Sequence, residues 1–194
     1  DGNSVESVVM KYKYGNTICI SSQVGCRMGC AFCASTIGGL VRNLEASEIL
    51  DQVLFSQIDC GERISNIVLM GIGEPLDNFD NVIKFISMVS DQNGLNIGQR
   101  NISLSTCGII PGINQLLDKH LQLTLSISLH APDNEIRCQI MPVNKKYNID
   151  EIVSASKYYF EKTGRRVIFE YTLIKGTNDS NACALELSKL TRGF

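Results

Sequence analysis

Three closely spaced cysteines, Cys26, Cys30 and Cys33, form the most chemically informative stretch of this 194-residue chain. Thiolates at this spacing can converge on one soft metal centre, and Gly25 and Gly29 let the backbone wrap closely around it. A structural zinc site or an ordinary ferredoxin cluster closes with a fourth protein ligand. A four-iron cubane held by only three cysteines would instead leave one iron open to a substrate.

Two other interpretations of these cysteines remain open. Zinc could recruit a fourth ligand from Cys19, Cys60 or His130, and the grouping of thiols could be a chance one.

The chain has eight cysteines, but they are bunched and the first residues do not resemble a signal peptide. A metal or redox role in the cytoplasm is therefore favoured over a framework of disulfides.

A glycine-rich turn with a carboxylate, Gly71-Ile72-Gly73-Glu74-Pro75, follows a predicted strand over Ile64–Met70. Its two glycines bring the backbone close to a ligand, and the glutamate lies at the carboxyl end of a strand, where α/β folds bind ligands. Taken alone, the stretch fits a surface turn equally well. Ser105 ends a predicted strand over Asn101–Ser105, and the residues from Ser128 to His130 lie at the end of a predicted strand over Gln122–Ser128. Both strand ends therefore put small polar groups on the same edge of the sheet as the glutamate.

Short β-branched runs alternate with longer stretches of helical period. We predict strands over Thr17–Ser21, Ile64–Met70, Asn101–Ser105, Gln122–Ser128 and Val167–Leu173. We predict helices over Ala46–Ile58, Asn81–Ser90, Ile149–Thr163 and Asn181–Leu190, with N-cap candidates at Asn78, Asp80 and Asp150. The segment Ser4–Tyr14 alternates like a strand and precedes the turn Tyr14-Gly15-Asn16, which predicts a hairpin strand at the start.

Five strands alternating with helices predict an all-parallel α/β sheet, because parallel strands need right-handed crossover connections. A length of 194 residues with 44% hydrophobic residues suits one domain with a sizeable core. No apolar run reaches the roughly 18 residues that a membrane span needs, so we expect no membrane association. The net charge of −2 provides no global attraction for nucleic acid, although a local basic patch is compatible with it.

The CxxxCxxC spacing after the first strand of a βα repeat resembles that of radical S-adenosylmethionine (SAM) enzymes. The flanking sequence, Cys19-Ile-Ser-Ser-Gln-Val-Gly-Cys followed by Gly38-Gly-Leu-Val-Arg-Asn-Leu, resembles the RlmN/Cfr family more narrowly. The likeness runs from about Glu6 to the last residue. It implies a radical SAM partial (β/α)6 barrel, with about five βα units present after an N-terminal β-hairpin. It also implies methylation of C2 or C8 of an adenine in ribosomal RNA, and Pro75 favours the C2 enzymes.

The resemblance assigns roles to most of the residues above. It implies that a [4Fe–4S] cluster is bound by Cys26, Cys30 and Cys33. It implies that SAM is contacted by Gly73, Glu74, Ser105, Ser128, Leu129 and His130.

Two further residues receive catalytic roles from the resemblance. Cys19 matches a resolving thiol, which releases the product by forming a disulfide with an RNA-linked cysteine, and Glu6 matches an acidic proton acceptor. From the residues alone, Cys19 could equally be buried strand filler and Glu6 an ordinary exposed glutamate.

The implied reaction needs a radical, because C2 of adenine has no nucleophilic character and cannot accept a methyl group by polar transfer. In the family, SAM first methylates a C-terminal cysteine. A radical from a second SAM then activates that methyl group for addition to the base. The implied partners are 23S rRNA, with tRNA as a second candidate, and an electron donor such as flavodoxin or ferredoxin, all in the cytoplasm.

The resemblance further implies that residues 1–194 are a radical SAM core domain cut from a longer enzyme. The family's N-terminal accessory domain and the C-terminal segment with the methyl-carrying cysteine then lie outside it, and we expect these 194 residues alone to be inactive as a methyltransferase. The alternatives are a different radical SAM reaction, such as that of an activase, and a non-catalytic Fe–S or zinc-binding module.

Overall fold

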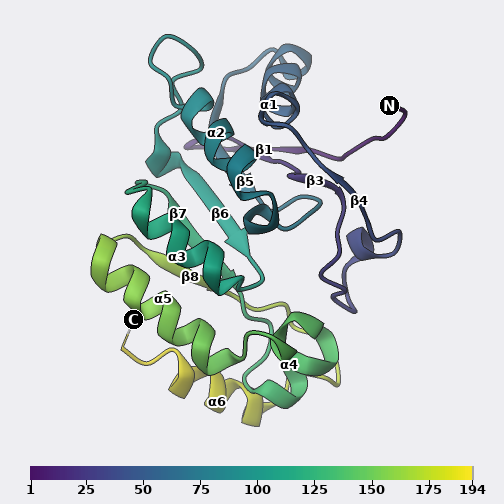
Figure 1. Cartoon of the computed structure of the whole chain (residues 1–194), viewed down its shortest axis with the longest axis vertical. Coiled ribbons are helices and arrows are strands. Elements are labelled where there is room, and N and C mark those ends of the chain that lie inside the picture. The colour runs from purple at the N-terminus through teal and green to yellow at the C-terminus, as the bar shows by residue number, and fades with distance from the viewer. Residues whose placement is uncertain (194) are drawn as a thin grey trace.

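The computed structural model describes residues 1–193 and is built on a mostly parallel six-stranded sheet. The strands, in chain order, are β1 (Val8–Tyr12), β2 (Gly15–Cys19), β5 (Ile64–Leu69), β6 (Ile102–Thr106), β7 (Thr124–Ser128) and β8 (Val167–Glu170). They lie side by side in that same order, and only β1 runs antiparallel to its neighbour. Figure 1 shows the helices layered over the sheet.

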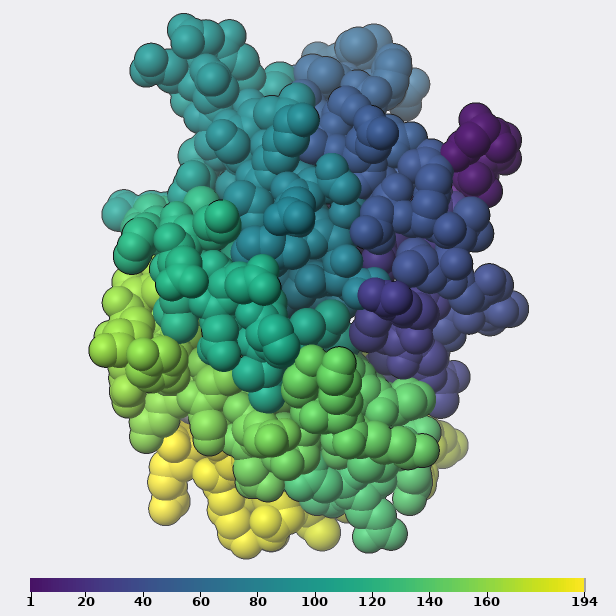
Figure 2. Space-filling model, viewed as in Figure 1, coloured from purple at the N-terminus to yellow at the C-terminus, as the bar shows by residue number. Residues whose placement is uncertain are grey.

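The helices follow the strands in the alternation that the sequence predicts. They are α1 (Ala46–Cys60), α2 (Phe79–Val89), α3 (Ile110–Asp118), α4 (Asn134–Ile140), α5 (Ile149–Thr163) and α6 (Asn181–Leu190). A small second sheet pairs β3 (Gln23–Gly25) with β4 (Leu40–Asn43). In the space-filling view the chain colour changes gradually across the face, so successive βα units are neighbours in space (Figure 2).

The predicted α/β class, the five parallel strands, the four helices and the N-terminal hairpin are confirmed. The turn of the hairpin was misplaced, because Gly15 and Asn16 already pair with Tyr12 and Lys11 in the ladder. The cap of α5 was also misplaced. Asn148 and not Asp150 accepts the backbone hydrogen bond there, from Glu151 N.

Two helices escaped the sequence analysis. The helix α3 has a proline and a glycine in its first turn, and these residues obscure its helical pattern in the sequence. The glycine, Gly112, is needed for packing. A Cβ on Gly112 would lie 2.8 Å from Cβ of Leu76. The seven residues of α4 are too few to show a helical period.

The main core lies between the sheet and the helices α1, α2, α3 and α5. Each of these helices buries an apolar face, represented by Ile49, Phe85, Ile113 and Ile152, none of which is exposed. The strands contribute alternate apolar residues to this core, such as Ile102 and Leu104 of β6 and Leu125 and Ile127 of β7. In residues 1–193, no helix has both the length and the apolar character required to cross a membrane.

A buried guanidinium ties the carboxyl ends of two strands to α4. Arg137 is fully buried and donates hydrogen bonds to the carbonyl oxygens of Cys107 (2.7 Å), Ser128 (3.1 Å) and Leu129 (2.9 Å). It also donates to Oδ1 of Asn144 at 3.1 Å. Burial lowers the pKa of Arg137. These bonds satisfy carbonyl groups at the end of the strand ladder and just beyond it.

Replacing Arg137 with Met should lower the free energy of unfolding by about 3 kcal/mol, because several buried carbonyl groups lose a charged donor. Urea unfolding of the full-length protein measures the change. Arg166→Met is the matched control, since the Arg166 side chain is exposed and has no ion pair among residues 1–193. Equal unfolding midpoints for the two variants would contradict this role of Arg137.

Candidate active site

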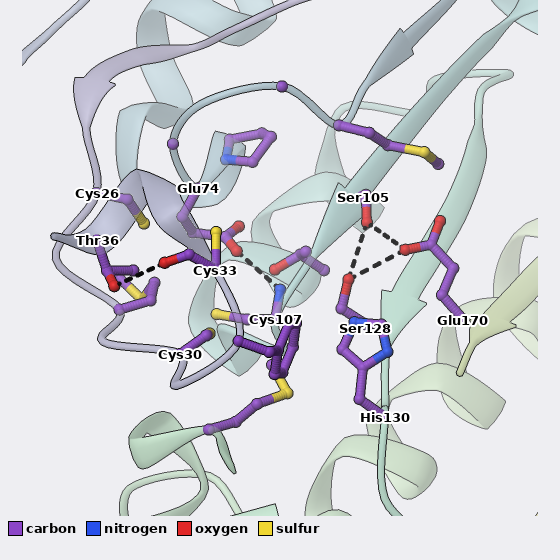
Figure 3. A pocket seen from close by; sticks show the side chains of 18 of the residues that line it. Cys26, Cys30, Cys33, Thr36, Glu74, Ser105, Cys107, Ser128, His130 and Glu170 are labelled. Atoms are coloured by element: carbon purple, nitrogen blue, oxygen red, sulfur yellow. Dashed lines mark hydrogen bonds between the residues drawn. The ribbon is translucent and has the colours of Figure 1, made fainter. Parts of the chain in front are cut away.

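A cavity of about 300 Å³ opens at the carboxyl ends of the parallel strands. The cysteine loop forms one side of it, and residues that end β6, β7 and β8 form the other (Figure 3). Loops after all five parallel strands meet here, because parallel strands end at the same edge of a sheet. The cavity is therefore lined by reactive and polar side chains from positions far apart in the sequence.

The cysteine loop is held by the small sheet of β3 and β4. Cys26 N donates to Gly39 O at 3.0 Å, and Ala31 N donates to Ile140 O at 2.8 Å. Gly25 has a φ of 74°, and a Cβ on it would lie 1.9 Å from Gly39 O. No side chain fits at position 25 unless the hairpin moves, so this glycine fixes where the loop begins.

All three cysteines line the cavity. Burial raises the pKa of the Cys30 thiol to about 11, and its neighbours Cys26 and Cys33 add to the effect because like charges repel. Burial also raises the pKa of Cys26. Burial therefore favours the protonated form of Cys26 and Cys30, and a cation bound beside them would favour their thiolates.

The donor set of the loop fits an iron–sulfur cluster. Cys26, Cys30 and Cys33 are thiols on one short loop, and all three face the same cavity (Figure 3). In residues 1–193, no three His, Cys, Asp or Glu side chains gather closely enough to hold a single metal ion. A cubane makes a different demand, since each thiolate binds a different iron and the sulfur atoms stand apart. The residues that would hold the cluster are thus these three.

The turn after β5 packs directly against the residues after β2. A Cβ on Gly71 would lie 2.7 Å from backbone atoms of Ile20, and a Cβ on Gly73, which has a φ of 105°, would lie 2.6 Å from Cβ of Gln23. Gly71 N donates to Ile20 O at 3.0 Å. Both glycines of the predicted turn are therefore required by close backbone approach, and the turn presents Glu74 to the cavity.

Glu74 is a buried carboxylate whose two oxygens each accept a backbone hydrogen bond. Leu76 N donates to Oε1 at 3.0 Å, and Cys107 N donates to Oε2 at 2.7 Å. Burial raises the pKa of Glu74, while these hydrogen bonds act in the opposite direction. A cationic group in the cavity would stabilise the ionised form of this carboxylate.

Ser105 and Ser128 lie side by side at the ends of β6 and β7. Both hydroxyls donate to Oε2 of Glu170, at 3.0 and 3.1 Å (Figure 3). Glu170 is the last residue of β8, and the register that pairs it with Ser128 brings the three side chains together.

His130 follows β7 with a φ of 56° and lines the same cavity. Thr172 N donates to its Nδ1 at 3.0 Å, and its ring meets Phe32 edge to face at 5.1 Å between centroids. Burial, aided by the charge of Arg137, lowers the pKa of His130 to about 4. The imidazole is therefore neutral at pH 7, with Nδ1 accepting and its proton on Nε2.

The cavity brings together Cys26, Cys30, Cys33, Gly73, Glu74, Ser105, Ser128 and His130 from the predicted set. Leu129 is not among the lining residues, and its side chain is fully buried. Cys19 and Glu6 also lie outside the lining but near the same edge of the sheet. Cys19 ends β2 opposite Val8, and the backbone oxygen of Glu6 accepts from Ser21 Oγ at 2.7 Å.

Sequence reasoning missed two residues, Glu170 and Arg137. The sequence signal for Glu170 is a lone acid inside the apolar run Val167–Leu173, a pattern that predicts only the middle of a strand. Arg137 lies in the short helix α4, which had no sequence signature.

Comparison with known proteins agrees with this arrangement. Residues 20–185 match the family model of the radical SAM superfamily. The probable dual-specificity RNA methyltransferase RlmN of Clostridium novyi (strain NT) is 60% identical over 194 residues, which is all of this chain and 57% of the relative. The chain thus spans a little over half the length of that curated relative.

Solved structures show the same fold. A radical SAM methyltransferase from Sphaerobacter thermophilus superposes with a TM-score of 0.96 at 42% identity, covering 100% of this chain and 57% of that one. SuiB of Streptococcus suis, bound to S-adenosylmethionine, superposes with a TM-score of 0.60 at 17% identity, covering 87% of this chain and 36% of that one. The second likeness concerns the fold alone.

Replacing Gly25 with Ala should sharply reduce the iron bound per chain, because the new Cβ displaces the strand that positions Cys26. Iron analysis of the anaerobically reconstituted full-length protein measures this. Gly38→Ala is the matched control, since a Cβ there has no atom within 4 Å. We expect the control to keep its iron, and normal iron content in Gly25→Ala would show that the loop tolerates the shift.

Proposed function

This chain belongs to the radical SAM superfamily, and we propose that it is the core of an RNA methyltransferase that adds a methyl group to C2 of adenine. The observation that carries the proposal is that the three cysteines and Glu74 line one cavity at the carboxyl ends of the strands. The identity of 60% over the whole chain to a probable RlmN supports the choice of an RNA substrate.

The superfamily uses a [4Fe–4S] cluster and SAM. Bound here, they would supply a carbon radical by one-electron reductive cleavage of SAM. The residues proposed to hold the cluster are Cys26, Cys30 and Cys33. Three protein ligands would leave one iron of such a cluster without a protein ligand, and all three cysteines line the cavity.

Glu74 is proposed to bind the amino group of SAM. Its carboxylate is buried and already oriented by two backbone donors, so it is preorganised for a cation. Ser105, Ser128 and His130 are proposed as further SAM contacts, since all three line the same cavity. The backbone of Gly73 and Leu129 is proposed to complete the pocket.

Cys19 is proposed as the resolving thiol and Glu6 as the proton acceptor. Both lie at the sheet edge that carries the cavity, but outside the residues that line it. We propose that they act on the substrate base and do not contact SAM. Burial raises the pKa of Cys19, so its reaction would require a base nearby. Glu6 is exposed and belongs to the segment that precedes β1, next to the end of β2.

The proposed substrates are 23S rRNA and tRNA, and the target adenine must leave its RNA fold to reach the cavity. We propose a low-potential electron donor such as flavodoxin or ferredoxin, and a cytoplasmic location. These 194 residues are proposed to be the core domain. The methyl-carrying cysteine is proposed to lie outside them, in a segment that corresponds to the part of the relative that this chain does not cover.

The full-length protein, reconstituted anaerobically and given SAM, a reductant and unmodified RNA, should form 2-methyladenosine. Mass spectrometry of the digested RNA measures it, with 23S rRNA fragments and tRNA tested separately. Cys30→Ala is the inactive control, since it removes one proposed cluster ligand. SAM cleavage with no methylated RNA would indicate another radical SAM reaction, and 8-methyladenosine would contradict the choice of C2.

Cys19→Ala should retain its iron and still cleave SAM, but should trap a covalent complex between protein and RNA. The reason is that a resolving thiol acts only after the adduct has formed. A denaturing gel of the full-length variant with labelled RNA detects the complex. Cys60→Ala, which lies at the end of α1 away from the cavity, should release its product normally. Loss of iron in Cys19→Ala, or turnover without an adduct, would remove this role.

A further inference from the structure

A second cavity lies at the amino ends of the parallel strands, at the opposite end of the sheet from the candidate active site. Its volume is about 570 Å³, and it is formed by residues at or just before the start of β6, β7 and β8, together with the end of α5. Its lining includes Arg100, Thr124, Phe160, Arg165, Arg166 and Val167. We call it the arginine cavity.

The three guanidinium groups of the arginine cavity have no acidic partner. Arg100, Arg165 and Arg166 form no ion pair with any residue between 1 and 193, whereas Arg27 and Arg42 both pair with carboxylates. The C-terminus of α5 lies beside Arg165, but a helix end carries only about half a negative charge. The cavity therefore holds an excess of positive charge, in a chain whose net charge is −2.

One arginine of the cavity is anchored, and two are available to a ligand. Arg165 is half-buried, and its Nε donates to the carbonyl oxygen of Leu123 at 3.4 Å. Arg100 and Arg166 are exposed, and their side chains donate no hydrogen bond within residues 1–193. Guanidinium groups around one concave surface suit phosphate, which accepts several charge-assisted hydrogen bonds at once.

An aromatic ring in the same lining favours a nucleic acid over other phosphate ligands. The side chain of Phe160 is 41% exposed, and a nucleotide has both a phosphate for the arginines and a base that can stack on such a ring. An acidic electron-donor protein fits less well, because the strands would separate its redox group from the cysteine loop. β7 runs from Thr124 in the arginine cavity to Ser128 in the active-site cavity, and these four residue steps add roughly 13 Å to the path.

We propose that the arginine cavity binds phosphate groups of the RNA substrate, at the opposite end of the strands from the adenine that is modified. This inference rests on the proposed function, because it takes RNA to be the substrate. A folded RNA carries phosphates along its whole surface, so one molecule can contact two sites that are separated by the length of a strand. Phosphate contacts carry no sequence information, which suits two different substrates, 23S rRNA and tRNA.

The test measures RNA binding by the full-length, anaerobically reconstituted protein at several salt concentrations. The probe is whichever of an unmodified tRNA transcript and a 23S rRNA fragment the unaltered protein methylates. The double variant Arg100→Gln/Arg166→Gln should bind this RNA about tenfold more weakly. Its plot of log affinity against log salt should be shallower by about 1.5, because two fewer phosphate contacts release fewer counterions.

Two further double variants separate the cavity from general effects of charge and fold. Arg100→Lys/Arg166→Lys should keep most of the salt dependence, since the positive charges remain. Lys84→Gln/Lys157→Gln is the matched control, because it also removes two charges from exposed side chains, and both lie outside the arginine cavity. We expect the control to bind RNA as the unaltered protein does, and all proteins to contain the same amount of iron.

Four results would overturn the inference. Unchanged affinity and salt dependence in Arg100→Gln/Arg166→Gln would show that the cavity does not bind RNA, while methylation by the unaltered protein would leave the proposed function standing. An equal loss in the lysine control would assign the attraction to overall charge. Unchanged RNA binding with slower reduction by flavodoxin would assign the cavity to an acidic protein. If the unaltered protein methylates neither RNA, the proposed function fails and the inference fails with it.

Discussion

The carboxyl ends of parallel strands leave backbone carbonyl groups that the ladder no longer satisfies, and these same ends carry the residues of the candidate site. In this chain the guanidinium of Arg137 donates the missing hydrogen bonds at the ends of β6 and β7. It donates to the carbonyl oxygens of Cys107, Ser128 and Leu129 from a fully buried position. The strand ends are thereby held in place, and the side chains of Ser128 and of Glu74, through Cys107 N, are positioned with them.

Close backbone contact sets the opposite side of the cavity. Gly25 meets Gly39, and Gly71 meets Ile20, at distances that exclude a Cβ. These contacts fix the cysteine loop and the turn before Glu74 relative to the end of β2. The site therefore combines a loop of soft ligands, held by backbone hydrogen bonds and close glycine contacts, with a row of polar strand ends. Preorganisation of this kind reduces the entropy that a ligand must lose in ordering the protein.

Two carboxylates face this cavity and differ in their surroundings. Glu74 is enclosed and accepts two backbone hydrogen bonds, so burial and donors act on its pKa in opposite directions. Glu170 is partly exposed and accepts from two side-chain hydroxyls on one oxygen. The first environment suits a cationic group and the second suits neutral donors.

The sequence by itself determined the local features. The spacing of Cys26, Cys30 and Cys33, the glycines around Glu74, and the alternation of strands with helices are all short-range patterns. The bounds of α5 and α6 followed from periodicity and agree with the structure. Only the tertiary structure decided that Glu170 joins Ser105 and Ser128, and that Arg137 spans two strand ends. These contacts link residues as many as 65 positions apart, and they depend on strand register and on helix packing, which no local pattern specifies.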